Sequence, residues 1–123
     1  MNKLGVALAV SLLLLGCAGG SLSELAHENQ TNIAKLKVGM TRAAVVEHMG
    51  TKSASTHDGQ IANPFRTESF QGRSGARYEV LYYVTERRRF RPVHLELTTP
   101  LVLRNGVLTG WGMAMLQQAK NDR

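Results

Sequence analysis

Apolar residues recur at every second position over residues 77–85, and this period of two predicts a β-strand. One face of that strand would hold Tyr78, Val80, Tyr82 and Val84, and the other would hold Glu79, Leu81 and Tyr83. Because both faces carry apolar side chains, we expect neither to be simply exposed to solvent. Weaker alternation predicts further strands over residues 65–70, 93–97, 101–103 and 107–111.

Turn residues separate the predicted strands. Asn105-Gly106 is a strong signal for a two-residue hairpin, because both positions of a type I′ turn need a positive φ. Residues 51–64 are rich in Ser, Thr, Asp, Gly and Asn and predict a loop, in which His57-Asp58 takes a turn position. Pro100 has no N–H to donate to a sheet, so it marks an edge, a bulge or a break.

The spacing of apolar residues becomes helical before residue 50. Thr41 is the clearest N-cap, since its hydroxyl can accept a hydrogen bond from a free amide of the first turn, and Gly50 is placed to end that helix. Thr31-Asn32 caps a shorter predicted helix that reaches Lys37. Residues 113–120 are predicted either to form a short terminal helix or to fray.

Two helices followed by an antiparallel meander predict an α+β fold. We expect the two N-terminal helices to pack on one face of a three- to five-stranded antiparallel sheet, as a two-layer sandwich. The other face would be open, and Tyr83 and Trp111 on it form a candidate protein-binding surface. Packing in the core or at an edge is the alternative for both residues, and Tyr82 is the first candidate for the core.

The N-terminal residues form a secretory signal pattern. Lys3 precedes the apolar residues 4–15, and Gly16-Cys17 follows them. A transmembrane helix needs roughly 20 apolar residues, and this run is shorter. Leu14-Leu15-Gly16-Cys17 is similar to a bacterial lipobox, which implies cleavage before Cys17 and acylation of its thiol. An ordinary cleaved signal without lipid is the alternative.

Cys17 is the only cysteine of the chain, so we expect no disulfide. The predicted organisation is a signal peptide over residues 1–16, a lipidated cysteine and polar tether over 17–30, an α+β domain over 31–112 and a C-terminal tail over 113–123. A helix before Gln30 is the alternative for the end of the tether. Two or more acyl chains give stable anchoring. Ala18 stands where an aspartate often retains lipoproteins in the inner membrane, so we expect the outer membrane, on its periplasmic side.

Positive charge exceeds negative charge, with a formal net charge of +6, and the sharpest cluster is Arg87, Arg88, Arg89 and Arg91. Guanidinium groups bind phosphates and carboxylates in bidentate fashion. The cluster therefore predicts contact with an anionic lipid, a glycan or an acidic protein surface, and no nucleic acid is expected outside the cytoplasm. The alternative is a solvated loop whose charges are neutralised by Glu86 and Glu96.

Catalytic and metal-binding patterns are missing from the sequence. The four histidines are not spaced as zinc ligands, and neither a Gly-x-Ser-x-Gly motif nor a phosphate-binding glycine loop occurs. Glu68 and Glu79 lie on predicted strands and could meet across a strand pair, although salt bridges to Arg66 and Arg77 are the default explanation. We expect no enzymatic activity, no cofactor and no metal.

Residues 37–50 carry a family resemblance. Lys37-Val38-Gly39-Met40-Thr41-Arg42, followed by Val45-Val46 and Met49-Gly50, resembles the SmpA/OmlA (BamE-like) family of small outer-membrane lipoproteins, and Asn105-Gly106-Val107-Leu108 resembles its last hairpin. The resemblance covers roughly residues 33–111 and implies a BamE/BLIP-like sandwich. Ser53 stands where that family usually has proline. Residues 63–83 and the ending over residues 108–112 look more like a neighbouring group of uncharacterised lipoproteins with a similar fold.

Together these features predict a non-enzymatic envelope lipoprotein that binds or scaffolds another envelope protein. The resemblance implies a role in outer-membrane protein assembly or envelope integrity. A binder of anionic lipid or glycan through the arginine cluster is the second hypothesis. A modulator of an envelope enzyme is the third, and it rests on analogy of fold alone.

Overall fold

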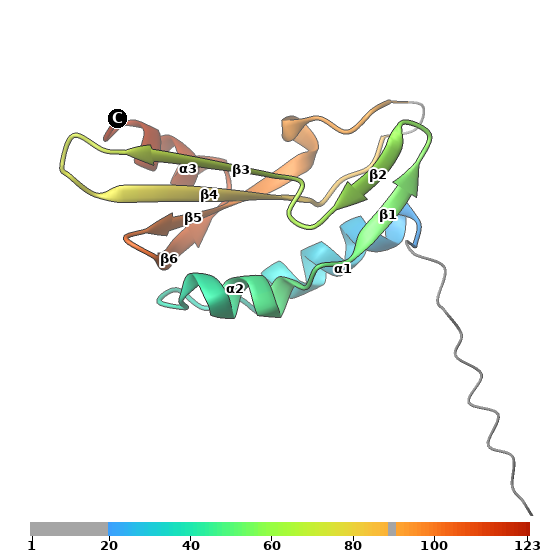
Figure 1. The fold of residues 1–123 in the computed structure, drawn as a ribbon, viewed down its shortest axis with the longest axis horizontal. Helices are drawn as coiled ribbons and strands as arrows, with labels where there is room; N and C mark the ends of the chain where they lie inside the picture. The colour runs from blue at the N-terminus through green and yellow to red at the C-terminus, as the bar shows by residue number, and fades with distance from the viewer. Residues whose placement is uncertain (1–19, 89–90) are drawn as a thin grey trace, which may run out of the picture.

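The structure, a computed structural model, describes residues 20–88 and 91–123. This part contains the helices α1 (Leu22–Ile33), α2 (Arg42–Met49) and α3 (Met113–Lys120). A small hairpin pairs β1 (Ser53–Thr56) with β2 (Gly59–Ala62). The main sheet contains β3 (Arg66–Gln71), β4 (Arg77–Val84), β5 (Thr98–Arg104) and β6 (Val107–Trp111), and the 3-10 turn η1 (Leu95–Leu97) precedes β5. Its strands follow in the order β3-β4-β5-β6, each antiparallel to the next (Figure 1).

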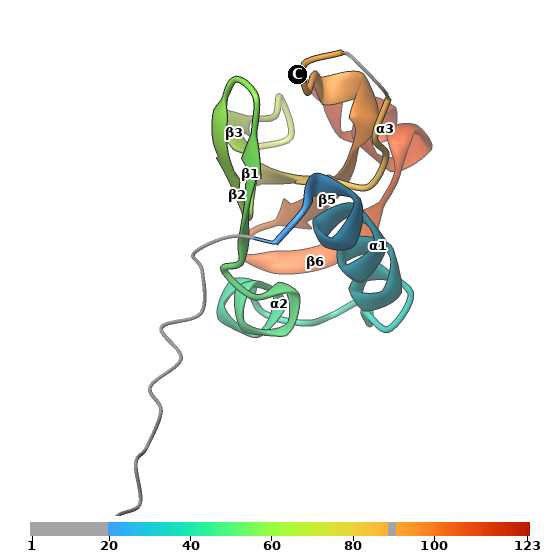
Figure 2. The ribbon, with the colours of Figure 1, turned by 90° about the vertical axis from the view of Figure 1, so that its right-hand side faces the viewer.

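The helices α1 and α2 cover one face of the main sheet (Figures 1 and 2). Val45 and Met49 of α2, together with Ile33 at the end of α1, pack on the sheet residues of this face, which are Leu81, Tyr83, Leu101, Leu103 and Leu108. Each large apolar side chain that is fully buried contributes about 1.5–3 kcal/mol. The predicted α+β fold, with two N-terminal helices on one face of an antiparallel sheet, is confirmed.

The helix α3 covers part of the opposite face of the sheet (Figure 2). Leu116 and Ala119 of α3 pack on Val80, Tyr82 and Val102. Residues 113–120 are therefore a packed helix rather than a tail, and they close much of the sheet face that the sequence leaves open. All buried apolar residues of the described chain lie between Leu25 and Ala119. A chain that starts at Ala18 thus keeps the whole of this packing.

The helix α1 occupies residues 22–30 of the predicted polar tether, where a helix before Gln30 was the alternative. It ends at Ile33, so the short helix predicted from Thr31 to Lys37 is wrong. The Oγ of Ser21 caps α1 by accepting a hydrogen bond from the amide N–H of Glu24 at 3.1 Å. The buried face of the helix is made by Leu25, Ala26, Asn29 and Ile33. Because this buried face includes an alanine and an asparagine, its hydrophobic pattern is weak, and the sequence alone suggests a polar linker.

Two predictions that depend on neighbouring residues are confirmed. Thr41 caps α2, its Oγ1 accepting a hydrogen bond from the amide N–H of Ala44 at 3.2 Å, and Gly50 follows the helix with a φ of +75°. Asn105 and Gly106, with φ values of +51° and +81°, form the turn between β5 and β6.

The β1–β2 hairpin occupies the middle of the loop predicted over residues 51–64, so that prediction is wrong. Thr56 pairs with Gly59 across the hairpin, and His57-Asp58 forms its turn, as expected. The amide N–H of Asp58 donates to Oγ1 of Thr56 at 3.2 Å. Within these two strands only Ala54 is buried, so the sequence shows no alternation there.

The turn η1 replaces most of the strand predicted over residues 93–97. Amide N–H groups at the end of β4, from Thr85 and Glu86, both donate to the carbonyl of Leu97, at 3.0 and 3.1 Å. The hydroxyl of Thr98 donates to the carbonyl of Leu95 at 2.5 Å. These bonds stabilise a compact turn against the sheet. An extended strand could not bring the carbonyls of Leu95 and Leu97 to these donors.

Pro100 lies inside β5 and does not interrupt it, since β5 pairs with β4 along its whole length. The carbonyl of Pro100 accepts a hydrogen bond from the amide N–H of Gly112 at 2.9 Å. Within a strand, the nitrogen and carbonyl of one residue point to the same side. Pairing with β6 starts only at Leu101, so the missing N–H of Pro100 faces a side where no strand needs it.

Candidate functional site

The described chain enters the fold beside β1. Gly20 forms an isolated bridge with Ala54, and its carbonyl accepts a hydrogen bond from the amide N–H of Ser55 at 3.3 Å. Cys17, the predicted lipidation site, and the predicted signal peptide lie outside the described residues. None of the described helices is long and apolar enough to cross a membrane.

Three arginines of the predicted cluster lie on the connection between β4 and η1. Arg87, Arg88 and Arg91 are exposed, and Arg89 lies outside the described residues. The Nη1 of Arg87 donates a hydrogen bond to Oγ of Ser23 at 2.9 Å. This contact holds the connection against the first turn of α1, although the two segments are far apart in the sequence.

The carboxylates expected to neutralise this cluster do not pair with it. Among residues 20–88 and 91–123, the ion pairs join Arg42 to Glu79 and Lys52 to Glu28. Arg87, Arg88 and Arg91 thus form no ion pair within that part of the chain, and their charge stays available to other anions.

A groove opens between the arginine connection, the start of α1 and the β1–β2 hairpin, which converge at one end of the molecule (Figure 2). Its volume is about 910 Å³, and its lining is mostly apolar. We call it the arginine groove and define it by Leu22, Ile61, Val93, Arg87, Arg88 and Arg91. The hairpin turn adds His57 and Asp58 to its rim. The groove thus combines an apolar wall with three guanidinium groups.

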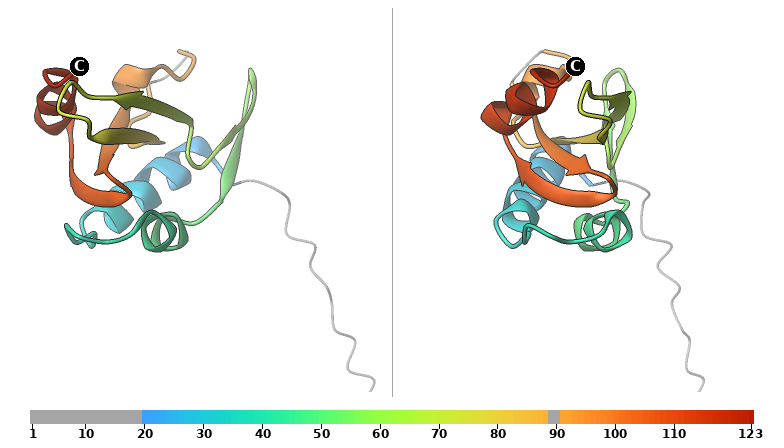
Figure 3. Two further views of the ribbon diagram at one scale, coloured as in Figure 1. Left: turned by 60° about the vertical axis from the view of Figure 1, so that its left-hand side comes forward. Right: turned by 90° about the vertical axis from the view of Figure 1, so that its left-hand side faces the viewer.

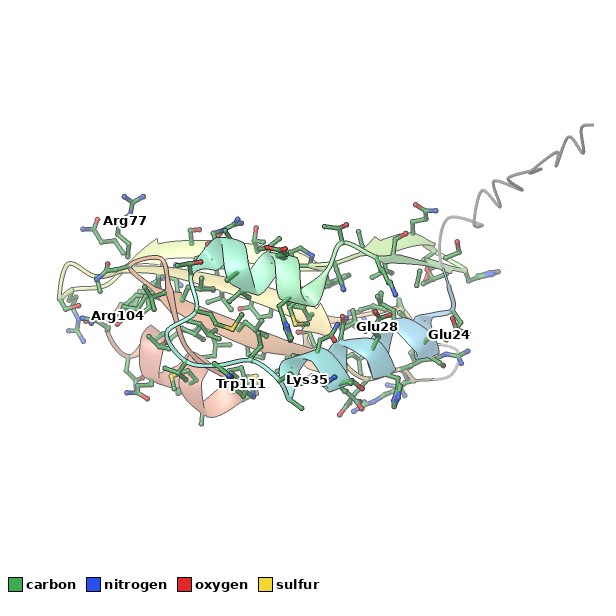
Figure 4. All side chains as sticks on the ribbon, turned by 90° about the horizontal axis from the view of Figure 1, so that it is seen from below. Glu24, Glu28, Lys35, Arg77, Arg104 and Trp111 are labelled. Atoms are coloured by element: carbon green, nitrogen blue, oxygen red, sulfur yellow. The ribbon has the colours of Figure 1, made fainter. Side chains whose placement is uncertain are left out.

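The predicted protein-binding surface of Tyr83 and Trp111 does not form. Tyr83 is 0% exposed and packs in the core under α2, because both faces of the central strand β4 are covered. Burial raises the pKa of Tyr83 to about 12. Trp111 is half-buried at the end of β6 and packs against the same core, so its role is edge packing (Figure 4).

The two strand carboxylates do not meet. Glu68 pairs in register with Val80 and Glu79 with Ser69, which places the two side chains on opposite faces of the sheet. Glu79 instead accepts a hydrogen bond from Nε of Arg42 at 2.7 Å, and this bond raises the pKa of Arg42. In the described part of the chain, no group of three or more His, Cys, Asp or Glu side chains is arranged to hold a metal ion.

The two edges of the main sheet differ. The segment before α2 covers the start of β6, where the amide N–H of Gly39 donates to the carbonyl of Leu108 and the amide N–H of Leu108 donates to the carbonyl of Met40, both at 2.8 Å. Along the outer side of β3, by contrast, no strand of the described residues is paired. β3 is therefore the free edge.

The free edge presents polar backbone groups to solvent. The amide N–H of Gly72 donates to the carbonyl of Ala76 at 2.8 Å, which fixes the side that faces β4. Because hydrogen bonding alternates along an antiparallel strand, the N–H and C=O groups of Thr67, Ser69 and Gln71 point outward. An open depression of about 950 Å³ adjoins this edge and is lined by Ser69, Gln71, Arg77 and Glu79, among others.

The chain belongs to the family described as "Protein of unknown function (DUF3192)". The family model matches residues 21–118. The match begins at the residue that caps α1 and ends within α3, so it takes in both sheet faces and the arginine connection. No curated protein and no solved structure matches the chain.

A buried amide pair within the matched segment was missed by sequence reasoning. Nδ2 of Asn29 donates to Oδ1 of Asn63 at 3.0 Å, and Nδ2 of Asn63 donates to Oδ1 of Asn29 at 2.8 Å. The Asn29 amide also donates to the carbonyl of Val84 at 2.8 Å. This pair ties α1 to the end of the hairpin and to β4, and so fixes the walls of the arginine groove. A polar residue in helical register with Leu25, Ala26 and Ile33 is the signal that could have revealed it.

Proposed function

We propose that this protein is a non-enzymatic, lipid-anchored protein of the bacterial cell envelope, on the periplasmic side of the outer membrane, that binds an extended segment of another envelope protein at the free edge of β3. The observation that carries the binding part is the unpaired side of β3. An exposed edge strand offers a row of backbone donors and acceptors on which another chain can add a strand.

The anchoring part is supported by the position of Gly20. If Cys17 carries the lipid, three residue steps of at most about 3.6 Å each leave Gly20 within about 11 Å of it. The helix α1 starts only two residues later. The start of α1 and the β1–β2 hairpin then lie close to the bilayer, without the long tether that the sequence suggests.

In this arrangement the end of β3 that leads into the β3–β4 turn lies far from the proposed anchor. The β3–β4 and β5–β6 turns lie at the end of the molecule opposite the β1–β2 hairpin (Figures 1 and 3). A partner that reaches the protein from the periplasm would meet this end and the depression beside Ser69 and Gln71 first.

The proposal gives no catalytic role to the acidic and histidine side chains, since several of them have structural partners. Glu79 bonds Arg42, and Asp122 accepts hydrogen bonds from Ser74 and Tyr78. His48 has its Nε2 at 2.7 Å from the carbonyl of Asn32, which joins α2 to the end of α1.

Replacing Ser69 with proline tests the binding part. Ser69→Pro removes an outward N–H and places a ring on the free edge, while the bonds to β4 remain because they come from the neighbouring residues. Affinity capture from crosslinked membranes should recover a reproducible partner with the unmodified protein and lose it with Ser69→Pro.

The matched control is Ser69→Ala, which changes the same side chain and keeps the N–H. It should capture the partner as the unmodified protein does, and circular dichroism should show that both variants are folded. Equal capture by the proline variant, or recovery of the unmodified protein without any partner, would refute edge binding. The anchoring part is tested separately, since Cys17→Ser should move the protein from the membrane fraction to the soluble fraction.

A further inference from the structure

The arginine groove places unpaired cations above an apolar wall. Arg87, Arg88 and Arg91 line it and form no ion pair among the described residues. A single carboxylate, Asp58, shares the lining with them. The groove therefore has an excess of positive charge, and its lining as a whole is mostly apolar in area.

The tertiary structure brings this charge to the place where the chain enters the fold. The Arg87–Ser23 hydrogen bond holds the arginine connection on the first turn of α1, and Gly20 is bridged to β1 beside the same groove. Figure 2 shows the start of α1, the hairpin and the arginine connection gathered at one end of the molecule. Electrostatic attraction is screened over about 8 Å at physiological salt, so charges at this end act on whatever surface lies beside the entry point.

We infer that the arginine groove docks on the surface of an anionic bilayer. Arg88 and Arg91 bind lipid phosphates, which match the planar donor fork of guanidinium. Leu22, Ile61 and Val93 reach the boundary between headgroups and acyl chains, as apolar side chains of surface-bound proteins do. This orientation rests on the proposed function, which anchors the protein at Cys17. The contact between the groove and the bilayer does not itself need the acyl chains.

A protein partner fits this groove less well than a bilayer does. If Cys17 is lipidated, Gly20 stays within about 11 Å of it, and the next residue, Ser21, lines the groove, so a bilayer that holds the anchor lies beside the groove. The apolar side chains at the groove come from three separate segments of the chain and lie beside guanidinium groups, which is the arrangement of a membrane-surface contact.

Vesicle binding tests the inference with a chain that starts at Ala18 and therefore carries no lipid. It should co-sediment with vesicles in which about a third of the phosphatidylcholine is replaced by phosphatidylglycerol. It should not co-sediment with phosphatidylcholine alone, and added salt should weaken binding. Arg88→Gln combined with Arg91→Gln should weaken binding about twenty-five-fold, at roughly fivefold for each basic residue near the surface.

The matched control removes two positive charges from the other end of the molecule. Arg77 and Arg104 are exposed there, opposite Glu24 and Glu28 (Figure 4). Arg77→Gln combined with Arg104→Gln gives the same net charge as the groove variant, and it should keep binding within a few-fold of the unmodified chain. If the two double variants lose affinity equally, the attraction belongs to the whole molecule and the docking site is refuted.

Two further experiments distinguish binding to a bilayer from binding to free phosphate, and distinguish failure of this inference from failure of the proposed lipid anchor. Ile61→Ser combined with Val93→Ser should weaken vesicle binding severalfold and leave any binding of glycerol phosphate unchanged. Equal vesicle binding by this variant would overturn the apolar part of the inference. Absence of vesicle binding by the unlipidated chain would refute docking, whereas the fractionation of Cys17→Ser and the capture by Ser69→Pro report on the proposed function independently.

Discussion

The side chain of Tyr83 illustrates what burial does to a single residue. Its hydroxyl is buried and has no hydrogen-bond partner among the described residues. Leaving a buried polar group unpaired costs about 1–3 kcal/mol. The ring is nevertheless retained in the core, where it packs beside Leu81 and Leu101. The sequence shows a tyrosine on an alternating strand, which is compatible with an exposed binding surface, and only the cover of α1 and α2 excludes that use.

We predict that Tyr83→Phe keeps or raises stability and removes part of its pH dependence. Burial raises the pKa of Tyr83 to about 12 from an ordinary value of 10.0. Below pH 10 the phenol is neutral in both states. Between pH 10 and 12 the unfolded state ionises first, so stability falls by about 3 kcal/mol, at about 1.4 kcal/mol per pKa unit. Urea unfolding from pH 9 to 12 should show this fall in the unmodified protein.

In Tyr83→Phe the alkaline loss should be smaller, since the remaining loss comes from other groups. Tyr82, whose pKa is also raised by burial, is present in both proteins and titrates in both. Parallel stability curves for the two proteins over this pH range would contradict the assignment.

At the scale of elements, the docking of α3 depends on a contact at its C-terminal end. Oδ1 of Asp122 accepts a hydrogen bond from the amide N–H of Ser74 at 3.1 Å, and Oδ2 accepts one from the Ser74 hydroxyl and another from the Tyr78 hydroxyl at 2.9 Å. Gly72 allows this approach, since a Cβ there would clash with the Asp122 carboxylate. The β3–β4 turn and α3 are thus held together.

Asp122→Asn should loosen α3 without unfolding the main sheet. The hydrogen bonds from Ser74 and Tyr78 lower the pKa of Asp122, so the stability they supply is present above the ordinary value of 3.8 and is lost as the pH falls through the folded pKa. Hydrogen exchange of the α3 amides should therefore be faster in Asp122→Asn at neutral pH.

The two proteins should exchange at similar rates once the pH is low enough to protonate Asp122. Amides of α2, on the other face of the sheet, provide the internal control and should be unchanged. Faster exchange in both helices would mean that the substitution destabilises the whole domain and not the docking of α3.

The whole molecule is joined through the amide pair of Asn29 and Asn63. The pair connects α1, the segment after the hairpin and the end of β4, and it is the part of the fold that links the arginine groove to the main core. Since a buried polar network stabilises the native state only when its members are satisfied, losing one amide leaves the others unpaired.

Asn29→Ala should lower the free energy of unfolding by about 2–4 kcal/mol, because the Asn63 amide and the Val84 carbonyl lose their partner in the core. Gln30→Ala is the matched control. Gln30 also donates to a carbonyl at the end of β4, that of Thr85, but its side chain is exposed, so the loss should stay below about 1 kcal/mol. If urea unfolding shows the same loss of unfolding free energy for both variants, the buried pair stabilises the fold no more than an exposed hydrogen bond does.

The sequence by itself determined the features that depend on neighbouring residues. The cap at Thr41 and the hairpin at Asn105-Gly106 follow from local hydrogen bonding and from φ, and the strand over residues 77–84 follows from its period. The arginine cluster is likewise visible as charge. The lipidation of Cys17 and the resemblance to SmpA/OmlA lipoproteins are predictions of the same local kind, and they remain predictions.

The tertiary structure alone decided which surfaces are covered and which segments meet. The buried face of the helix α1 contains the polar residue Asn29. The hydrophobic pattern of the sequence cannot distinguish such a helix from a polar linker. β1 and β2 bury almost nothing, so no alternation predicts them. The arginines of the groove lie beside apolar side chains only because the fold brings Leu22 and Ile61 to them from distant parts of the chain. Local rules fix φ and capping, whereas burial depends on what packs above a residue, and that is settled only when the chain closes on itself.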